Sequence, residues 1–444
     1  MSDTMNRMLA GSREKAEVGV GDGLLGWIPA MVIAYATILT PLLLQQNVSA
    51  VDDTAGAAAV TQGSNLGNQI FWILMLMLTG YASRHRLTQL LDVLRKPLVV
   101  LIGLYMILAF ASILWSPAPS VDFRRATLQF IVLATVVLPI FLAENRMAQI
   151  DRLVAVFLLT IAINLVAVIV LPAGRLGHQG IYSHKNELGL VVAYGFVFCL
   201  YAIVRYRGFV RLLAMACATA ALLELVLSQS KTSLGLAVMM PLIALAVVGT
   251  SRLMRINALL PLTFGLFVCI SGGLFVAHLI DFSFADFSML LFDDTTFTGR
   301  TVIWNFLVDV ITREPLLGQG YGSFWDIGEG SIVQREAPGF VAYLLQGHNG
   351  YVDVTVELGL LGLALLLAFL ICVLYHVGRA ASGRGGDIAL TWLFMICILI
   401  GLCHNMLESS WFRGYSVVWM VFLLVGAWAQ AFSDETARMP VKDR

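Results

Sequence analysis

The chain has 444 residues, of which 59% are hydrophobic and only 13% are charged. A soluble protein of this length could not bury so much apolar surface in ordinary cores, so lipid must solvate part of it. The 28 basic residues are balanced by 28 acidic residues, which gives no support for a nucleic-acid partner. The composition therefore predicts a membrane protein.

Apolar stretches of about 20 residues, long enough for a helix to cross a bilayer, recur along the whole chain. The first follows a polar start and is too long for the apolar core of a signal peptide, so it is predicted to be a retained span. The expected fold class is all-α, a polytopic membrane protein with about 12 transmembrane helices and one large outer loop. The predicted spans cover residues 24–44, 64–82, 97–115, 126–143, 153–172, 187–204, 210–228, 233–249, 257–279, 352–376, 388–406 and 414–432.

The charges of the connecting loops predict which side of the membrane each loop faces. With the N-terminus in the cytoplasm, most of the 28 basic residues fall on the cytoplasmic side, as the positive-inside rule requires. Residues 1–23 and 433–444 are then cytoplasmic tails, the spans lie within 24–280 and 348–432, and residues 281–347 form the large outer loop.

The large loop contains a predicted amphipathic helix, "TVIWNFLVDVITRE" at residues 301–314, which Pro315 should end. Such a helix beside a membrane lies at the interface or caps a cavity. Its apolar stripe consists of Val302, Ile303, Phe306, Leu307, Val310 and Ile311.

The sequence contains no pattern that predicts a metal site. The six cysteines lie in or at the ends of apolar runs without CxxC spacing, and the outer loops contain no DxD or HxxxH. Neither a metal nor another cofactor is expected.

Polar motifs gather on the predicted outer face. In the last of them, His404 and Glu408 are candidates to line an outer cavity. The motifs are "GHQGIYSHKNELG" (177–189), "SQSKTSLG" (228–235), "FTGRTVIW" (297–304), "GHNGYVDVTVELG" (347–359) and, more weakly, "CHNMLESSWFRG" (403–414).

Together with "PLLGQGYGSFW" (315–325), these motifs resemble the O-antigen ligase and polymerase superfamily of bacterial membrane glycosyltransferases, most closely its ExoQ-like, Wzy-type exopolysaccharide-polymerase branch. The resemblance implies a GT-C-like helical fold in the bacterial inner membrane. It also implies a polysaccharide polymerase that moves a polyprenyl-diphosphate-linked glycan, without a metal, to a sugar hydroxyl of another lipid-linked repeat unit at the periplasmic face. The expected partners are that lipid-linked oligosaccharide, membrane lipid, and polysaccharide chain-length and export proteins.

Cations on the outer face suit the departure of a polyprenyl diphosphate, because fixed positive charge stabilises an anion strongly beside a low-dielectric boundary. Arg300 is the first candidate, since its guanidinium fork matches phosphate oxygens and it lies next to a helix N-terminus. Lys231, where the family often has arginine, is the second. Lys185 and either Arg124 or Arg125 are further candidates.

The attacking hydroxyl needs a base, and by resemblance this role falls on the histidine of the HN motif, His348. An imidazole, with an ordinary pKa of about 6.5, suits proton uptake near neutral pH. The adjacent Asn349 is expected to contact substrate. Asp353 and Glu357, four residues apart, share a helix face and could orient the imidazole or bind sugar hydroxyls.

Other functions remain open at this stage. A ligase of the same family would transfer the glycan to a lipid core or a protein. A twelve-span transporter or flippase would show two six-span halves and polar sites at the midplane, whereas the motifs here gather at one surface. A purely structural partner in an export complex would not need clustered histidine and cations.

The individual residues also have ordinary structural interpretations. His348 could be a hydrated interfacial residue, and Lys231 a charge that extends from the membrane to water. Arg300 could pair with Asp293 or Asp294.

Overall fold

The computed structural model describes residues 21–44, 66–174, 176–292, 294–328, 330–382 and 387–438, together with Gly19. Throughout these residues the regular structure is helical, and the one β contact is an isolated bridge between Gly174 and Gly177. Ten helices in this part of the chain are long and apolar enough to cross a membrane. The predicted all-α, polytopic membrane fold is therefore confirmed.

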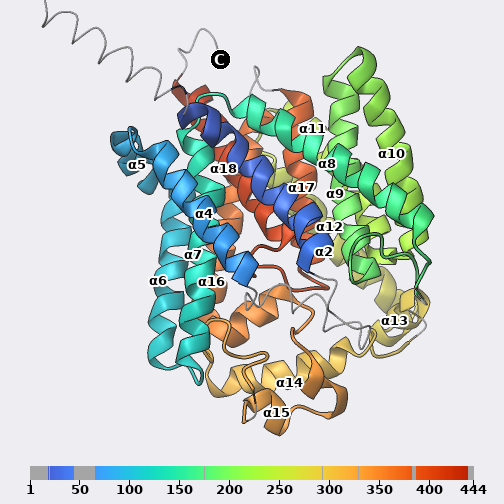
Figure 1. Cartoon of the computed structure of the whole chain (residues 1–444). Coiled ribbons are helices and arrows are strands. Elements are labelled where there is room, and N and C mark those ends of the chain that lie inside the picture. The colour runs from blue at the N-terminus through green and yellow to red at the C-terminus, as the bar shows by residue number, and fades with distance from the viewer. Residues whose placement is uncertain are drawn as a thin grey trace, which may run out of the picture.

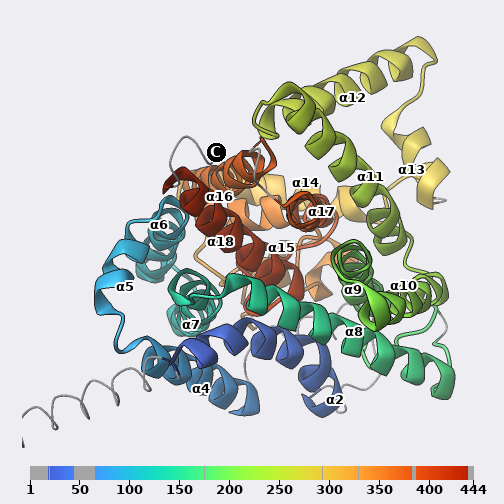
Figure 2. The same cartoon turned by 90° about the horizontal axis from the view of Figure 1, so that it is seen from above.

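The membrane-length helices follow the predicted spans in chain order. Figure 2 shows α17 and α18 inside the bundle and α12 at its edge. The first, Gly21–Leu43, contains a π-helical turn, η1 (Tyr35–Leu39), and continues into α2 (Thr40–Leu44). The others are Pro97–Leu114, formed by α6 (Pro97–Ala111) and η2 (Ser112–Leu114), then α7 (Pro119–Leu142), α8 (Arg146–Val170), α9 (Lys185–Arg205), α10 (Gly208–Ser228), α11 (Lys231–Met254), α12 (Leu259–Leu279), α16 (Gly350–Ser382) and α18 (Val417–Arg438).

The remaining two predicted spans form helices at the expected places, but they are not among the ten helices that are long and apolar enough to cross a membrane. α4 (Leu66–Ser83) has 18 residues, and polar Asn68 near its start accepts a hydrogen bond from the Tyr35 hydroxyl at 3.0 Å. α17 (Ile388–His404) has 17 residues and is buried along most of its length.

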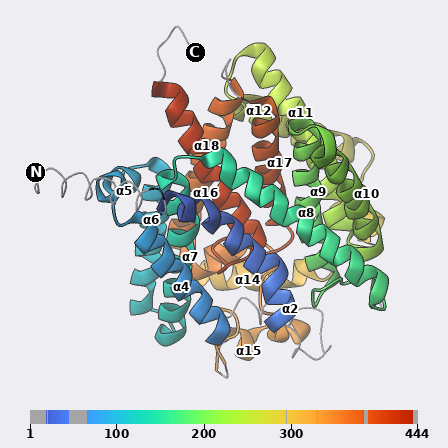
Figure 3. The same ribbon diagram turned by 45° about the horizontal axis from the view of Figure 1, so that its top comes forward.

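The short elements separate the two ends of the bundle, as Figures 1 and 3 show from different directions. At one end lie α13 (Phe284–Phe292), α14 (Arg300–Arg313), α15 (Ile332–Glu336) and η3 (Gly339–Tyr343). At the other end lie α5 (Leu87–Leu94) and the last turns of α18. Ion pairs join helix termini at this second end: Arg86 with Asp22 at 3.3 Å, Lys96 with Asp434, and Arg146 with Glu435. The predicted outer loops and the predicted cytoplasmic loops thus lie at opposite ends of the bundle. Which compartment each end faces stays a prediction.

The amphipathic helix predicted in the large loop is α14, which begins one residue earlier, at Arg300, and ends at Arg313. It packs at the end of the bundle and has a small core of its own. That core contains its buried residues Ile303, Phe306, Leu307 and Val310, with Phe324, Trp325, Val333, Val341, Leu344 and Val356.

A break in α16 joins this loop to the bundle. Leu358 and Gly359 leave the helical conformation, and Gly359 has a φ of +64°, which favours glycine. The break frees backbone groups that lipid could not satisfy, and residues 315–320 of the large loop satisfy them. The hydrogen bonds run from Leu360 N to Pro315 O (2.8 Å), Leu361 N to Leu316 O (3.3 Å), Gln319 N to Val356 O (2.9 Å) and Gly320 N to Glu357 O (2.8 Å).

Candidate functional site

Two glycines surround His348 because other groups approach the backbone closely there. The Gly347 N–H donates to both oxygens of Asp353, at 3.1 and 3.0 Å, and a Cβ at Gly347 would lie only 2.5 Å from one of them. The Gly350 N–H donates to the Asn405 carbonyl at 2.8 Å, and a Cβ there would meet the Asn405 side chain. The turn therefore sits tightly between the start of α16 and residues 405–411.

Asn349 caps α16. Its Oδ1 accepts from the N–H groups of Tyr351 and Val352, at 3.1 and 3.2 Å. Its own N–H donates to Ser409 Oγ at 3.2 Å. His348, just before it, has a φ of +49°. This backbone conformation is uncommon for residues other than glycine, and it is often found at functional sites.

His348 and Arg300 meet at one carboxylate, that of Glu408. His348 Nδ1 lies 2.9 Å from Glu408 Oε2, and Arg300 Nη2 lies 3.4 Å from Oε1. Gln346 Nε2 donates to Oε2 at 3.1 Å. Three segments, at the start of α14, before α16 and after α17, thus converge on a single acidic group.

Glu408 is ionised at neutral pH. Burial acts to raise the pKa of its carboxyl, but the hydrogen bond and charge of His348, with His404 and Arg300, outweigh burial and lower the pKa to about 2. Burial lowers the pKa of Arg300, and Glu408 acts against it. Arg300 also donates from Nε and Nη2 to the Leu407 carbonyl, at 3.2 and 3.0 Å, so its fork is already engaged.

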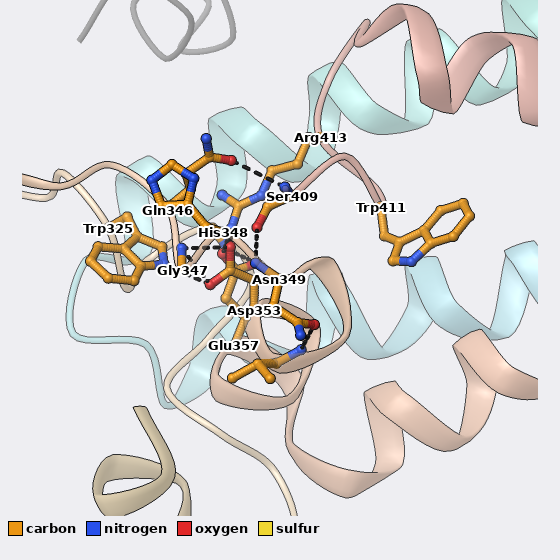
Figure 4. A network of polar contacts seen from close by, with 12 residues as sticks. Trp325, Gln346, Gly347, His348, Asn349, Asp353, Glu357, Ser409, Trp411 and Arg413 are labelled. Carbon is orange, nitrogen blue, oxygen red and sulfur yellow. Dashed lines mark hydrogen bonds and ion pairs between the residues drawn. The ribbon is translucent and has the colours of Figure 1, made fainter. Parts of the chain in front are cut away.

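A second charge cluster lies directly beneath this turn, and Figure 4 shows the two together. The side chains of Asp353 and Glu357 are only 2% and 5% exposed, and Arg413 Nη2 lies 3.2 Å from the first and 2.9 Å from the second. Trp325 Nε1 also donates to Asp353 at 2.9 Å, and the Gly322 N–H donates to Glu357 at 3.0 Å. The predicted shared helix face is present, but its carboxylates bind Arg413, while Glu408 binds the imidazole.

Arg413 is the centre of this second cluster. Burial acts to lower its pKa, but the charges of Glu357 and Asp353 outweigh burial and raise it. A cavity of about 50 Å³ adjoins the cluster, and its lining includes Arg125, Tyr321 and Trp325.

Arg125 fastens the large loop to α7. Its Nη1 donates to the carbonyls of Gly322 and Trp325, the latter at 3.1 Å, and its Nη2 lies 3.9 Å from Asp326. Arg124, the alternative candidate, is exposed. Arg125 therefore borders the second cluster, with most of its contacts made to backbone.

Lys185 and Lys231 are the first residues of α9 and α11 and belong to a neighbouring group. Lys185 Nζ donates to the Leu176 carbonyl at 3.1 Å, and Lys231 is exposed. Their motifs touch: a Cβ at Gly177 would meet the Ser228 carbonyl oxygen.

Arg300 does not pair with Asp294, one of the two acidic partners suggested for it from the sequence. Arg300 pairs with Glu408, whereas Asp294 accepts hydrogen bonds from Thr296 Oγ1 and Thr298 N, both at 2.6 Å. Asp293, the other suggested partner, lies outside the described residues.

Sequence reasoning missed Arg413 and gave Glu408 only a cavity-lining role. The signal for Arg413 was present, because two carboxylates on one helix face at a membrane surface require a cation, and Arg413 was one of few basic residues on that side. Nothing local pairs His348 with Glu408, which lies 60 residues away.

Residues 216–367 match the family model described as O-Antigen ligase. The chain is 30% identical over 291 residues to "Exopolysaccharide production protein ExoQ" of Rhizobium meliloti (strain 1021), covering 61% of this chain and 63% of that protein. It is 24% identical over 127 residues to "Putative polysaccharide ligase" of Rickettsia bellii (strain RML369-C) and to "Putative polysaccharide ligase RP358" of Rickettsia prowazekii (strain Madrid E), covering 28% of this chain and 31% of each relative. The matches thus span less than two thirds of these relatives, and they confirm the resemblance drawn from the motifs.

Proposed function

Because residues 216–367 match the O-antigen ligase family model and the chain is similar to the ExoQ protein over 61% of its length, we propose that it is a membrane glycosyltransferase of the polysaccharide polymerase type. It would transfer a glycan from a polyprenyl diphosphate to a sugar hydroxyl of a second lipid-linked repeat unit. The observation that carries the proposal is the meeting of His348 and Arg300 on Glu408, beside the large loop. Base and cation are thereby held at one place on the bundle.

In this proposal His348 accepts the proton of the attacking hydroxyl through Nε2. The described residues give Nε2 no hydrogen-bond partner, since only Nδ1 is engaged by Glu408. Asn349 caps α16 and so fixes the turn that presents the imidazole. It would therefore have this structural role in addition to its proposed contact with substrate.

The cations would neutralise the departing diphosphate. Arg300 would exchange part of its contact with Glu408 and Leu407 for phosphate oxygens, because its present partners occupy most of its N–H groups. Lys231 and Lys185, at the N-termini of two neighbouring helices, would add charge where helix dipoles also favour an anion. Asp353, Glu357 and Arg125, predicted to contact substrate, would instead support this surface from below, through Arg413 and the large loop.

Ligase-type transfer to a lipid core or a protein is the second candidate. It is favoured by the family description and by the names of the Rickettsia relatives. The two functions share the donor and differ in the acceptor. In either case we expect an inner-membrane enzyme with the site on the periplasmic side, associated with polysaccharide chain-length and export proteins.

The proposal is tested with purified protein in liposomes that carry a polyprenyl-diphosphate-linked repeat unit. We expect His348→Ala to lower the rate of glycan transfer by about 10²–10⁴-fold and Arg300→Ala by about 10²–10³-fold. The matched controls His278→Ala and Arg335→Ala, at exposed positions in α12 and α15, should retain full activity.

The products distinguish the functions. Polymer formed from the lipid-linked repeat alone supports the polymerase, whereas product formed only when a lipid core is added supports the ligase. Movement of the repeat unit across the bilayer with no new glycosidic bond would support a transporter instead. Normal transfer by His348→Ala would remove the base assignment.

A further inference from the structure

The contacts of Glu408 indicate a role beyond its ion pair with Arg300. Its Oε2 lies 2.9 Å from His348 Nδ1 and 3.1 Å from Gln346 Nε2, and its Oε1 lies 3.4 Å from Arg300 Nη2. We infer that Glu408 is the positioning residue of His348: it holds the imidazole proton on Nδ1 and leaves Nε2 to act as the base. This inference rests on the proposed function.

The tautomer follows from the charge of Glu408. An ionised carboxylate can only accept hydrogen bonds, and Glu408 faces the Arg300 guanidinium at 3.4 Å and the Gln346 amide N–H at 3.1 Å. A neutral imidazole beside it must therefore carry its proton on Nδ1, which leaves the Nε2 lone pair available. In the opposite tautomer two acceptors would face each other at 2.9 Å.

The carboxylate is itself held in place by its own segment. The Glu408 N–H donates to the His404 carbonyl at 2.9 Å, in the turn that ends α17. Gln346, which donates to the carboxylate, also accepts from the Ser409 N–H through Oε1 at 3.2 Å. His348, His404 and Arg300 are the charged or titratable groups that face Glu408. The contacts therefore fix the imidazole before substrate binds, as general-base catalysis requires.

The proposed step balances as follows. The acceptor hydroxyl gives its proton to Nε2, and its oxygen forms a bond to the anomeric carbon of the donor. The bond between that carbon and the phosphate oxygen breaks, and its electron pair leaves with the polyprenyl diphosphate. The imidazolium that forms then faces the Glu408 carboxylate, whose negative charge stabilises it.

The test compares initial rates for wild type, Glu408→Gln, Glu408→Asp, His348→Ala and the double variant His348→Ala/Glu408→Gln. Glu408→Gln keeps the shape but removes the charge, so we expect kcat to fall by about 10²-fold or more with KM nearly unchanged. Glu408→Asp keeps the charge at a shorter reach and should recover part of this loss. The double variant should be no slower than His348→Ala, within about twofold, because both changes remove the same function.

Glu336→Gln is the matched control, since Glu336 makes its ion pair with Arg313 at the surface of the same loop, and it should behave as wild type. A wild-type kcat for Glu408→Gln while His348→Ala is inactive would overturn the inference and leave the proposed function standing. An active His348→Ala would remove the proposed base itself. If Glu408→Gln does not fold, Glu408→Asp decides: kcat reduced about 10-fold or more supports positioning, and an unchanged kcat rejects it.

Discussion

The two ends of the bundle use charge in different ways. At the end that carries the large loop, three carboxylates are largely buried and each has several partners: Asp353, Glu357 and Glu408. Asp353 receives a backbone N–H, an indole N–H and a guanidinium, all within 3.2 Å. At the opposite end the contacts join helix termini, and two of their acids are largely exposed: Glu144 is 74% exposed and Glu435 is 48% exposed. The first arrangement is the proposed site, and the second joins helix termini.

Buried charges carry a large desolvation cost, so their presence requires an explanation. Replacing them by apolar side chains would often preserve stability equally well, whereas a glycosyl transfer needs a base and cations held away from bulk water. The loop end therefore has the features of a functional site. At the other end each ion pair joins helix termini, and where an acid is largely exposed, as in Glu144 and Glu435, the pair contributes little.

The largest difference between the ends should follow from Arg413→Ala. This change leaves Asp353 and Glu357 buried without their cation, so we expect a loss of about 3–5 kcal/mol in the free energy of unfolding. Thermal unfolding in detergent, followed by size-exclusion chromatography, measures the effect. Arg413→Lys keeps the charge without the fork and should lie between Arg413→Ala and wild type. A midpoint unchanged by Arg413→Ala would mean that the cluster contributes nothing to the fold.

The second-largest effect is expected at low pH, which should destabilise the loop end more than the opposite end. The pKa of Glu408 is lowered to about 2, so the stability that its ionisation contributes is present above about pH 4.5 and is lost as the pH falls through about 2. The difference in unfolding free energy between wild type and Glu408→Gln should therefore narrow by about 2–3 kcal/mol from pH 5 to pH 2. Hydrogen–deuterium exchange in residues 405–413, with residues 141–150 at the other end as reference, reports the change locally. A constant difference across this range would contradict the buried ion cluster.

Local patterns were sufficient for much of the fold and for part of the site. Helix length and apolar runs predicted the spans, and the apolar stripe predicted α14 within one residue. Spacing placed Asp353 and Glu357 on one face, and both do contact Arg413. Each of these properties depends on neighbours within a turn or two of helix.

The remaining features depend on segments far apart in the chain. Gly359 reads as an ordinary small residue in an apolar run, and nothing in that run shows that residues 315–320 will satisfy its freed backbone groups. The partner of His348 could not be chosen either, because Asp353, Glu357 and Glu408 all lie on the same side of the membrane in sequence terms. Only packing decides that the first two bind Arg413 and the third binds the imidazole.

The smallest effect is expected at the end opposite the large loop, from Arg146→Ala. Its guanidinium pairs with Glu435, which is 48% exposed, and donates to the Ile140 and Phe141 carbonyls at 2.9 and 3.2 Å. The Arg146 side chain is only 16% exposed, but Glu435 is half-exposed and can be hydrated when Arg146 is removed. We therefore expect a loss of about 0–1 kcal/mol and unchanged glycan transfer, measured by the same unfolding and transfer assays. If Arg146→Ala destabilised the protein as much as Arg413→Ala, the two ends would not differ in kind. The burial of charge at the loop end would then be a general property of this bundle and would lose its force as an argument for a site.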